Sequence, residues 1–205
     1  MQRSDFFCRA ATSWDPAEEI ARLLHHTDPY NYPGICKDPA NPELVDLISQ
    51  CMQTEANIFH ISNLSVIEHQ NHIVGIACVI PCGCELNFLE HVRISESFRQ
   101  KLHRVEGGYF APLISESQEY EGYNIANICI DPGYRGKRLG SLLVAHCLET
   151  YGSQPIHLDV IAANTPAVRL YQSYGFQCVA EYSGFSGSSA ALPCYHMLYT
   201  PTTAR

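Results

Sequence analysis

The residues with the clearest chemical potential form a basic, glycine-spaced turn in the second half of the chain. An apolar, β-forming stretch from Ile125 to Ile130 ends at the turn-forming triplet Asp131-Pro132-Gly133. The sequence Arg135-Gly136-Lys137-Arg138-Leu139-Gly140 follows, and an apolar helical stretch then begins at Ser141. A strand, a tight turn and a helix N-terminus direct unpaired backbone N–H groups and the positive end of the helix dipole at one point. The sequence therefore predicts an anion site, most often a phosphate site, at this turn.

Two common phosphate-binding motifs do not match this turn. A P-loop needs a glycine five positions before Gly136 and a Ser or Thr after Lys137, where this chain has Asp131 and Arg138. The dinucleotide pattern G-x-G-x-x-G is absent as well. What remains is the spacing Arg-x-x-Gly-x-Gly from Arg135 to Gly140, in which Arg138 stands at the position of the first glycine.

The turn and a second stretch further along the chain resemble the GNAT family of acetyl-coenzyme-A-dependent N-acetyltransferases. The first stretch runs from Ile130 to Leu143. The second runs from Asn164 to Phe176 and contains Leu170-Tyr171 on a predicted helix, and His196 to Tyr199 is similar to the final strand of the family. The resemblance covers about eighty residues and implies an α/β (α+β) fold. Such a fold has a mixed, mostly antiparallel sheet flanked by helices, with a splayed parallel strand pair at the cofactor site.

The resemblance also implies where acetyl-CoA binds. Backbone N–H groups of the turn would hold the pyrophosphate, with help from its three cationic side chains. The strand before the turn would pair with the pantetheine arm, and a backbone N–H near Cys129 would polarise the thioester carbonyl. The implied cofactor-binding residues are Ile128, Cys129, Ile130, Arg135, Gly136, Lys137, Arg138, Leu139, Gly140, Ser141, Asn164 and Tyr171.

Acetyl transfer to an amine needs two proton movements. The leaving thiolate benefits from a proton donor, and Tyr171, at the Leu-Tyr position of the family, is the candidate general acid. Tyr174 lies on nearly the same helical face and is a second candidate, while either ring could instead only pack against the sheet. Cys129 as a covalent nucleophile is disfavoured, because an apolar strand opposes its thiolate form. Asn164 could bind pantetheine or cap the helix that follows it.

The general base is harder to identify. Strict alternation would place Glu121, Tyr123, Ile125, Asn127 and Cys129 on one face of the predicted strand. Glu121 could then act as the base and Asn127 could orient a water, although a Glu near a strand end is usually only solvated. Asp28, Tyr30 and Tyr32, in a proline-flanked loop, could bind the cationic amine or could simply set the geometry of a turn.

Composition limits the other classes of function. The chain has 205 residues, 46% of them apolar, and a formal net charge of −8, so it is globular and lacks the basic balance of a nucleic-acid or membrane-surface binder. Its ten cysteines and the absence of a signal-peptide pattern favour a cytoplasmic protein with reduced thiols. Only Cys82 and Cys84 form a close pair, which is too few ligands for a zinc site, so no metal is expected. The oligomeric state is left open between a monomer and a homodimer.

The elements around the turn follow from periodicity and turn residues. We expect one domain over residues 1–205, with acceptor-side elements over about 1–120 and an acyl-CoA-binding core over about 121–199. The predicted strands cover Phe6–Ala11, a hairpin from Leu64 to Ile80 that turns at Gln70-Asn71, Ile125–Ile130, Pro155–Ala162, Phe176–Tyr182 and Tyr195–Tyr199. The first predicted helix is capped by Ser13 or Asp15, and the others begin at Asn41 or Pro42, at Ser141 and at Thr165.

The leading interpretation is an N-acetyltransferase that transfers acetyl from acetyl-CoA to a primary amine by direct attack in a ternary complex. The acceptor, a small-molecule or peptide amine, is not specified by the sequence. A second interpretation is a non-catalytic acyl-CoA-binding or sensor module with the same fold, because fold does not guarantee chemistry. A third is a cysteine-based redox or metal protein, which only Cys82 and Cys84 support.

Overall fold

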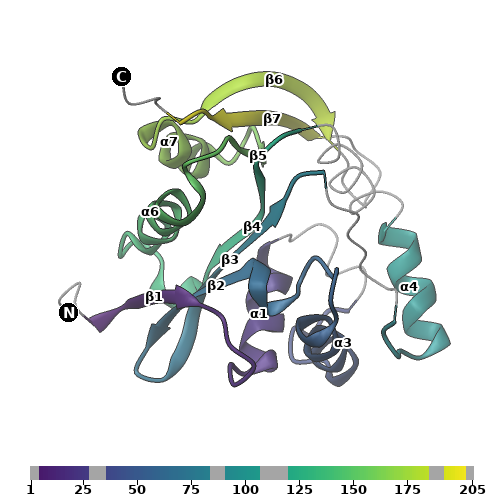
Figure 1. Cartoon of the computed structure of the whole chain (residues 1–205). Coiled ribbons are helices and arrows are strands. Elements are labelled where there is room, and N and C mark those ends of the chain that lie inside the picture. Colours follow the sequence, from purple (N-terminus) through teal and green to yellow (C-terminus); the bar gives the residue numbers. More distant parts are fainter. Residues whose placement is uncertain (1–4, 28–35, 84–90, 107–119, 185–191, 202–205) are drawn as a thin grey trace.

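The described residues form a seven-stranded sheet with helices on both faces. The structure is a computed structural model that describes residues 5–27, 36–83, 91–106, 120–184 and 192–201. The strand order is β1-β2-β3-β4-β5-β7-β6, and β4 and β5 are its one parallel pair (Figure 1). The strands are β1 Phe7–Ala10, β2 Leu64–His69, β3 His72–Pro81, β4 Tyr123–Ile130, β5 Ile156–Ile161, β6 Gln177–Gly184 and β7 Leu192–Tyr199. The helices are α1 Ala17–Thr27, α3 Pro42–Gln53, α4 Glu96–Glu106, α6 Leu139–Tyr151 and α7 Thr165–Ser173, with short 3-10 helices η2 Ile61–Asn63 and η3 Pro132–Tyr134.

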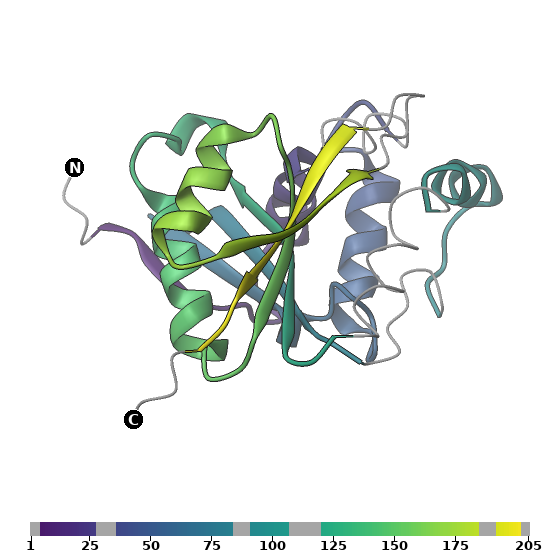
Figure 2. The same cartoon turned by 90° about the horizontal axis from the view of Figure 1, so that it is seen from above.

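The helices divide between the two faces of the sheet. Figures 1 and 2 show α6 and α7 on one face, α1 and α3 on the opposite face, and α4 beyond α3 at the periphery. Each face has its own apolar core: Leu23, Leu47 and Ile76 belong to the core under α1 and α3, and Leu143, Val160 and Met197 to the core under α6 and α7. We call these the α1 face and the α6 face.

Local sequence explains most of these elements. The two turn residues of the predicted hairpin, Gln70 and Asn71, have φ values of 51° and 64°, and this left-handed pair matches the twist of the flanking strands. The apolar second arm, β3, lies between β2 and β4, as its two-sided hydrophobicity predicts. The helix start predicted at Asn41 or Pro42 is confirmed, because α3 begins at Pro42 and the side chain of Asn41 caps it by accepting from the N–H groups of Glu43 and Leu44.

Asp15 has a different role from the predicted helix cap. Its carboxylate accepts a hydrogen bond from the backbone N–H of Thr12 and two from the Arg9 guanidinium, at 2.6–2.8 Å. Arg9 also donates to Glu68 on β2. Asp15 therefore fixes the chain between β1 and α1 rather than the first turn of α1.

A bulge interrupts β4 and overturns the expected alternation. Cys78 on β3 pairs with Asn127 while Val79 pairs with Ile125, so Ala126 is an extra residue on β4. Before the bulge, Ile125 packs on the α6 face; after it, Cys129 packs on the α1 face. The expectation of a single shared face was therefore wrong for the set Glu121, Tyr123, Ile125, Asn127 and Cys129.

The predicted parallel pair is confirmed, and its ladder stops at the bulge. Tyr123 to Ile125 pair with Ile156 to Leu158, and no pairing between β4 and β5 is recorded beyond them. The start of the pair is tightly held, since Gly122 has a φ of 91° and a Cβ there would lie 2.1 Å from the carbonyl oxygen of Pro155. Beyond Ile125 and Leu158, β4 and β5 no longer satisfy each other's backbone groups, which leaves their facing edges for another partner.

Candidate functional site

The basic turn has the backbone geometry of an anion site. Asp131, at the end of β4, caps η3 by accepting a hydrogen bond from the N–H of Gly133 at 2.8 Å, and it forms an ion pair with Arg22 of α1. Gly136 and Arg138 then take left-handed conformations, with φ values of 79° and 62°. Helix α6 begins one residue later, at Leu139. Asp131 thus fixes the start of the turn, and the turn ends at the N-terminus of a 13-residue helix.

Backbone donors of this turn are available to a ligand. Within the described residues, no acceptor is recorded for the N–H groups of residues 136 to 141. A Cβ built at Gly136 meets nothing within 4 Å, so the space in front of the turn is open. Consecutive unpaired N–H groups at a helix N-terminus attract phosphate oxygens, and the helix dipole adds to this attraction. The residues present therefore fit a phosphate or pyrophosphate group.

The three cations of the turn differ in their contacts. The Nε of Arg135 donates to the carbonyl oxygen of Ile130 at 3.3 Å, which holds its guanidinium beside the end of β4. The Nζ of Lys137 lies 4.6 Å from the centre of the Tyr134 ring, a cation–π contact. Arg138 precedes α6 in the left-handed conformation and makes no side-chain cap. A glycine at that position of the resembled pattern is understandable, because left-handed backbone is costly for any residue with a Cβ.

The predicted pantetheine strand presents alternate backbone groups to the open edge. The N–H of Asp131 donates to the carbonyl oxygen of Val74, so Asp131 faces β3. By alternation of the antiparallel ladder, Cys129 also faces β3, while Ile128 and Ile130 face the β5 side. The prediction of a thioester contact near Cys129 thus becomes more specific: the available N–H groups there belong to Ile128 and Ile130.

Cys129 itself has the environment of a structural thiol. Its side chain is buried in the core of the α1 face, and burial raises the pKa of its thiol to about 11. At neutral pH such a group is protonated and a weak nucleophile. This agrees with direct attack on the thioester rather than a covalent cysteine intermediate.

The two candidate acids are distinguished by their partners. The hydroxyl of Tyr174 donates to the carbonyl oxygen of Ser141 at 2.9 Å and so ties the end of α7 to the first turn of α6. Tyr171 is buried on the α6 face, its ring 5.8 Å from that of Phe176. Burial raises the pKa of Tyr171, which makes its hydroxyl a weaker acid than that of a free tyrosine and does not by itself support the role of proton donor. Tyr171 remains the predicted acid, and Tyr174 has a structural role.

The two predicted asparagine contacts are partly used within the protein. The Oδ1 of Asn164 accepts from the N–H of Ala167 at 3.4 Å, which confirms the alternative role as the N-cap of α7. The Nδ2 of Asn127 donates to the hydroxyl of Thr27 at 3.0 Å, at the end of α1. Each side chain keeps its other polar atom for the predicted role, which stays a prediction.

Glu121 differs from the expectation for a general base. Its side chain is exposed, and the contact recorded for it in the described residues uses the backbone carbonyl, which accepts from His157 Nε2 at 3.2 Å. His157 in turn belongs to a series of side chains in contact, which was not predicted from the sequence. His157 Nδ1 lies 3.1 Å from His196 Nε2, and His196 Nδ1 lies 2.9 Å from Asp159 Oδ1. We call Asp159, His196 and His157 the histidine relay.

The relay lies on the α1 face, beside the point where β4 and β5 part. Leu158, Val160 and Met197 point into the α6 face, so the alternate positions of β5 and β7 point the other way. His157 and His196 are buried, and the ring of Tyr120 stacks on both at centroid distances of 4.5 and 5.0 Å. In the sequence, the alternation of polar and apolar residues along Ile156–Ile161 could have indicated that His157 and Asp159 share a face of the strand. That Asp159 faces His196 follows only from the register between β5 and β7.

Some predicted residues lie outside the described part of the chain. Asp28, Tyr30, Tyr32 and Cys84 are among them, so the amine-loop hypothesis stays a prediction. Among the described residues, no group of three or more His, Cys, Asp and Glu side chains is arranged to hold a metal ion. Nor does any described helix have the length and hydrophobicity needed to cross a membrane.

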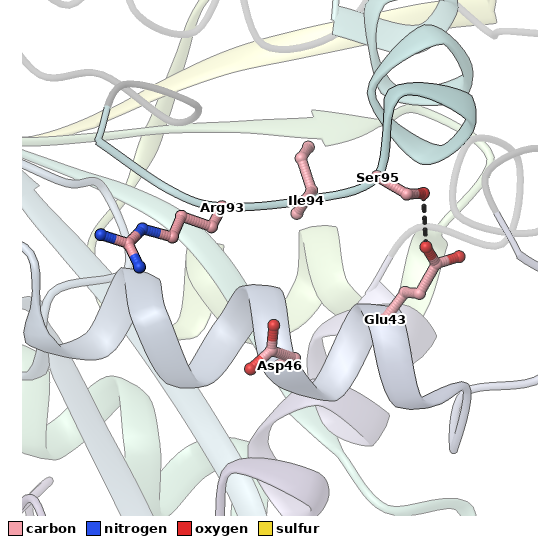
Figure 3. A pocket seen from close by; sticks show the side chains of 5 residues that line it. All are labelled: Glu43, Asp46, Arg93, Ile94 and Ser95. Carbon is pink, nitrogen blue, oxygen red and sulfur yellow. Dashed lines mark hydrogen bonds between the residues drawn. The ribbon is translucent and has the colours of Figure 1, made fainter.

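A cavity of about 290 Å³ lies elsewhere, between α3 and the segment that leads into α4 (Figure 3). It is lined by Glu43, Asp46, Arg93, Ile94 and Ser95. Its carboxylates already have partners, since Ser95 donates to Glu43 and Gln50 donates to Asp46. We assign the candidate site to the turn and the open strand edges rather than to this cavity.

A family model matches the part of the chain that contains the turn, and several curated proteins match 24% to 34% of the chain. Residues 108–176 match the model described as the acetyltransferase (GNAT) family. The ribosomal protein bS18-alanine N-acetyltransferase of Salmonella typhimurium is 42% identical over 53 residues, 24% of this chain and 36% of the relative. The spermine/spermidine N(1)-acetyltransferase of Bacillus subtilis is 42% identical over 56 residues, 25% of this chain and 37% of the relative. The matches span between 20% and 45% of the length of the curated relatives.

Solved structures extend the likeness of fold to nearly the whole chain. An N-acetyltransferase from Staphylococcus aureus superposes with a TM-score of 0.73 at 18% identity and covers 94% of this chain and all (100%) of its own. A putative acetyltransferase from Salmonella typhimurium, solved with its cofactor acetyl-CoA, has a TM-score of 0.59 at 16% identity and covers 98% and 97%. The fold is therefore the mixed α/β fold of these acetyltransferases, as predicted.

Proposed function

We propose that this protein, a chain with the GNAT fold whose residues 108–176 match the GNAT acetyltransferase family, is an acetyl-CoA-dependent N-acetyltransferase. The observation that carries the proposal is the turn after β4, where the N–H groups of residues 136 to 141 lack acceptors among the described residues in front of open space. A pyrophosphate supplies the oxygens that such a set of donors requires. Strand β4 leads into this turn, and beyond Ile125 its edge that faces β5 is unpaired. Such an open strand edge suits an extended chain such as pantetheine.

Each predicted residue then has a defined task. Gly136 to Ser141 hold the pyrophosphate through backbone N–H groups, and Arg135 and Arg138 supply positive charge. Ile128 and Ile130 hydrogen-bond the pantetheine and the thioester carbonyl along the open edge of β4. Acetyl-CoA supplies the activated acetyl group, and Tyr171 returns a proton to the leaving sulfur. The buried thiol of Cys129 makes direct attack by the amine the simpler route.

The acceptor is a primary amine of a small molecule or of a peptide. The names of the two relatives cited above cover both possibilities, spermine or spermidine and an alanine of a ribosomal protein. The net charge of −8 favours a cationic acceptor over an anionic one. We place this reaction in the cytoplasm, without a metal ion, in a monomer or a homodimer.

Binding and turnover test the proposal separately. We expect acetyl-CoA to raise the melting temperature of the full chain, because a ligand that binds only the folded state stabilises it. A panel of amines and peptides, with detection of released thiol, should then identify an acceptor. No shift with acetyl-CoA or CoA at millimolar concentration would refute the proposal. A shift without thiol release from any amine would favour the non-catalytic acyl-CoA-binding module.

A further inference from the structure

The histidine relay has acceptor groups at both of its ends. At one end is the carboxylate of Asp159, and at the other is the backbone carbonyl of Glu121, which can only accept. Between them stand the four ring nitrogens of His196 and His157, in three contacts of 2.9, 3.1 and 3.2 Å. Three hydrogen bonds between two terminal acceptors require three ring protons.

Two neutral histidines carry only two ring protons. With two protons, one of the three contacts has no proton and brings two lone pairs together. This contact is the one to Asp159, the one between the two rings, or the one to Glu121. A third proton completes the chain and makes one ring an imidazolium, which Asp159 balances through the contact with His196. His196 is the ring in contact with the Asp159 carboxylate, at 2.9 Å, so the geometry places the positive charge on His196 and leaves His157 neutral.

The surroundings of the relay leave Asp159 as its counter-ion. The position paired with His157 on β4 is Asn124, and on β6 the positions on the same face beside His196 are Ala180 and Tyr182. The Tyr120 ring stacks on both imidazoles and so favours a cation beneath it. Of these described neighbours only Glu121 carries another carboxylate, and it meets the relay through its backbone.

The position of the relay relates it to the proposed reaction. Asp159 follows Leu158, the last residue of β5 that pairs with β4, so it stands where the two strands part. The relay faces the α1 side and Tyr171 faces the α6 side, so the two proton movements are placed on opposite faces of the sheet. An amine that approaches the parted strands from the α1 face would meet Asp159 and His196 first.

Building on the proposed function, we propose that His196 and Asp159 take the proton of the acceptor ammonium group, with His157 as a positioning residue. The relay in its two-proton form accepts one proton from R–NH₃⁺, which completes its three hydrogen bonds. The freed amine forms the C–N bond while the C–S bond of acetyl-CoA breaks. The thiolate takes the Tyr171 proton, Tyr171 is restored by the second proton lost from nitrogen, and the relay releases its proton to water. The products are the amide, CoA–SH and H⁺.

The proton count can be observed without turnover. Nitrogen-detected NMR of the histidine side chains in the free, full-length protein should show both nitrogens of His196 protonated at mildly acidic pH. His157 should then be the neutral tautomer with its proton on Nε2. Two neutral rings throughout the range from pH 5 to pH 8 would overturn the proposal.

Kinetics test the role of the relay in catalysis. His196→Asn should lower kcat about 10²-fold and remove the rise of kcat with pH near neutrality, with the melting-temperature shift by acetyl-CoA unchanged. Asp159→Asn should do the same, and His146→Asn, a change on α6 outside the relay, should match the wild type. His157→Gln tests the positioning role of His157. It should shift the pH at which kcat rises rather than abolish the rise.

The outcomes separate the relay from the proposed function. Wild-type acetyl transfer with unaltered kcat and pH profile in His196→Asn would overturn the relay alone. A large loss in Glu121→Gln, with His196→Asn fully active, would instead return the role of base to the Glu121 carboxylate. Absence of acetyl-CoA binding in the wild type would refute the proposed function itself.

Discussion

The α6 face and the α1 face hold charge in different ways. On the α6 side, the turn after β4 gathers positive potential from backbone N–H groups of residues 136 to 141 and from a helix dipole. On the α1 face, the relay consists of two buried imidazoles in contact with each other and with a carboxylate. The first arrangement consists of backbone N–H groups and of Arg and Lys side chains, whereas the second contains imidazoles, the side chains suited to exchanging protons near neutral pH.

This difference separates two tasks of the proposed acetyl transfer. Phosphate binding should be constant over a wide pH range, and peptide N–H groups with Arg and Lys side chains provide that. Removal of a proton from an ammonium group needs a site that gains and loses protons, and histidines provide that. We therefore expect mutations on the α6 side to change affinity for acetyl-CoA and changes of pH to act through the α1 face.

The largest effect should come from a carboxylate placed in the turn. Gly136→Glu would bring a negative charge to the predicted pyrophosphate position and should raise the KM for acetyl-CoA by about 10³-fold, through repulsion at short range. Gly136→Gln is the matched control, because it has the same left-handed backbone strain and size without the charge. Equal KM values for the two variants would contradict the phosphate assignment and the comparison that rests on it.

A smaller effect is expected at the buried tyrosine of the α6 face. Tyr171→Phe should lower kcat by about 10²-fold with little change in acetyl-CoA affinity, because only the acidic hydroxyl is removed. Tyr174→Phe removes a hydroxyl bonded to Ser141 and should lower the melting temperature while keeping kcat. If Tyr171→Phe retained the wild-type kcat, the acid would have to lie elsewhere.

Acidification should weaken the fold through the α1 face. Burial is the first cause that lowers the pKa of both His26 and His157 from 6.5. The unfolded chain then binds more protons than the folded one between the lowered pKa and 6.5, so stability falls as pH drops below 6.5. Thermal melts from pH 8 to pH 5 should show this loss as a fall in melting temperature. His157→Gln should reduce the pH dependence, and an identical curve would contradict this assignment.

The smallest effect should come from the residue that departs from the family pattern. Arg138→Gly removes the left-handed strain before α6 and should raise the free energy of unfolding by about 1 kcal/mol. It should also raise the Kd for acetyl-CoA a few-fold, because a cation is lost. Arg138→Asn, which tolerates the same backbone conformation, is the control. A stability gain in neither variant would show that the strain is relieved by other contacts.

The local features of this protein could be predicted from its sequence. The turn from Asp131 to Gly140, the Gln70-Asn71 hairpin and the Asn41 cap each depend on a few consecutive residues whose backbone preferences are strong. The strand succession likewise indicated the parallel pair. The family resemblance supplied the roles of the turn and of Tyr171, which composition and spacing alone do not specify.

The features that sequence could not specify depend on register between distant strands. Asp159 and His196 lie 37 residues apart and face each other only because β5 and β7 pair in one particular register. Strict alternation failed in β4 because nothing in the apolar run marks Ala126 as an extra residue. Glu121 lies beside the relay, but its backbone carbonyl and not its carboxylate makes the contact.

The extra residue at Ala126 also bears on how the chain tolerates insertions and deletions. Its removal would place Ile125 directly before Asn127, so Cys78 and Val79 would keep their partners and the side chains from Asn127 to Ile130 would keep their faces. Asn127 would still reach Thr27, and Cys129 would still lie against α1. Deletion of Ile128, in contrast, would make Asn127 and Cys129 neighbours and turn one of them to the opposite face of the sheet.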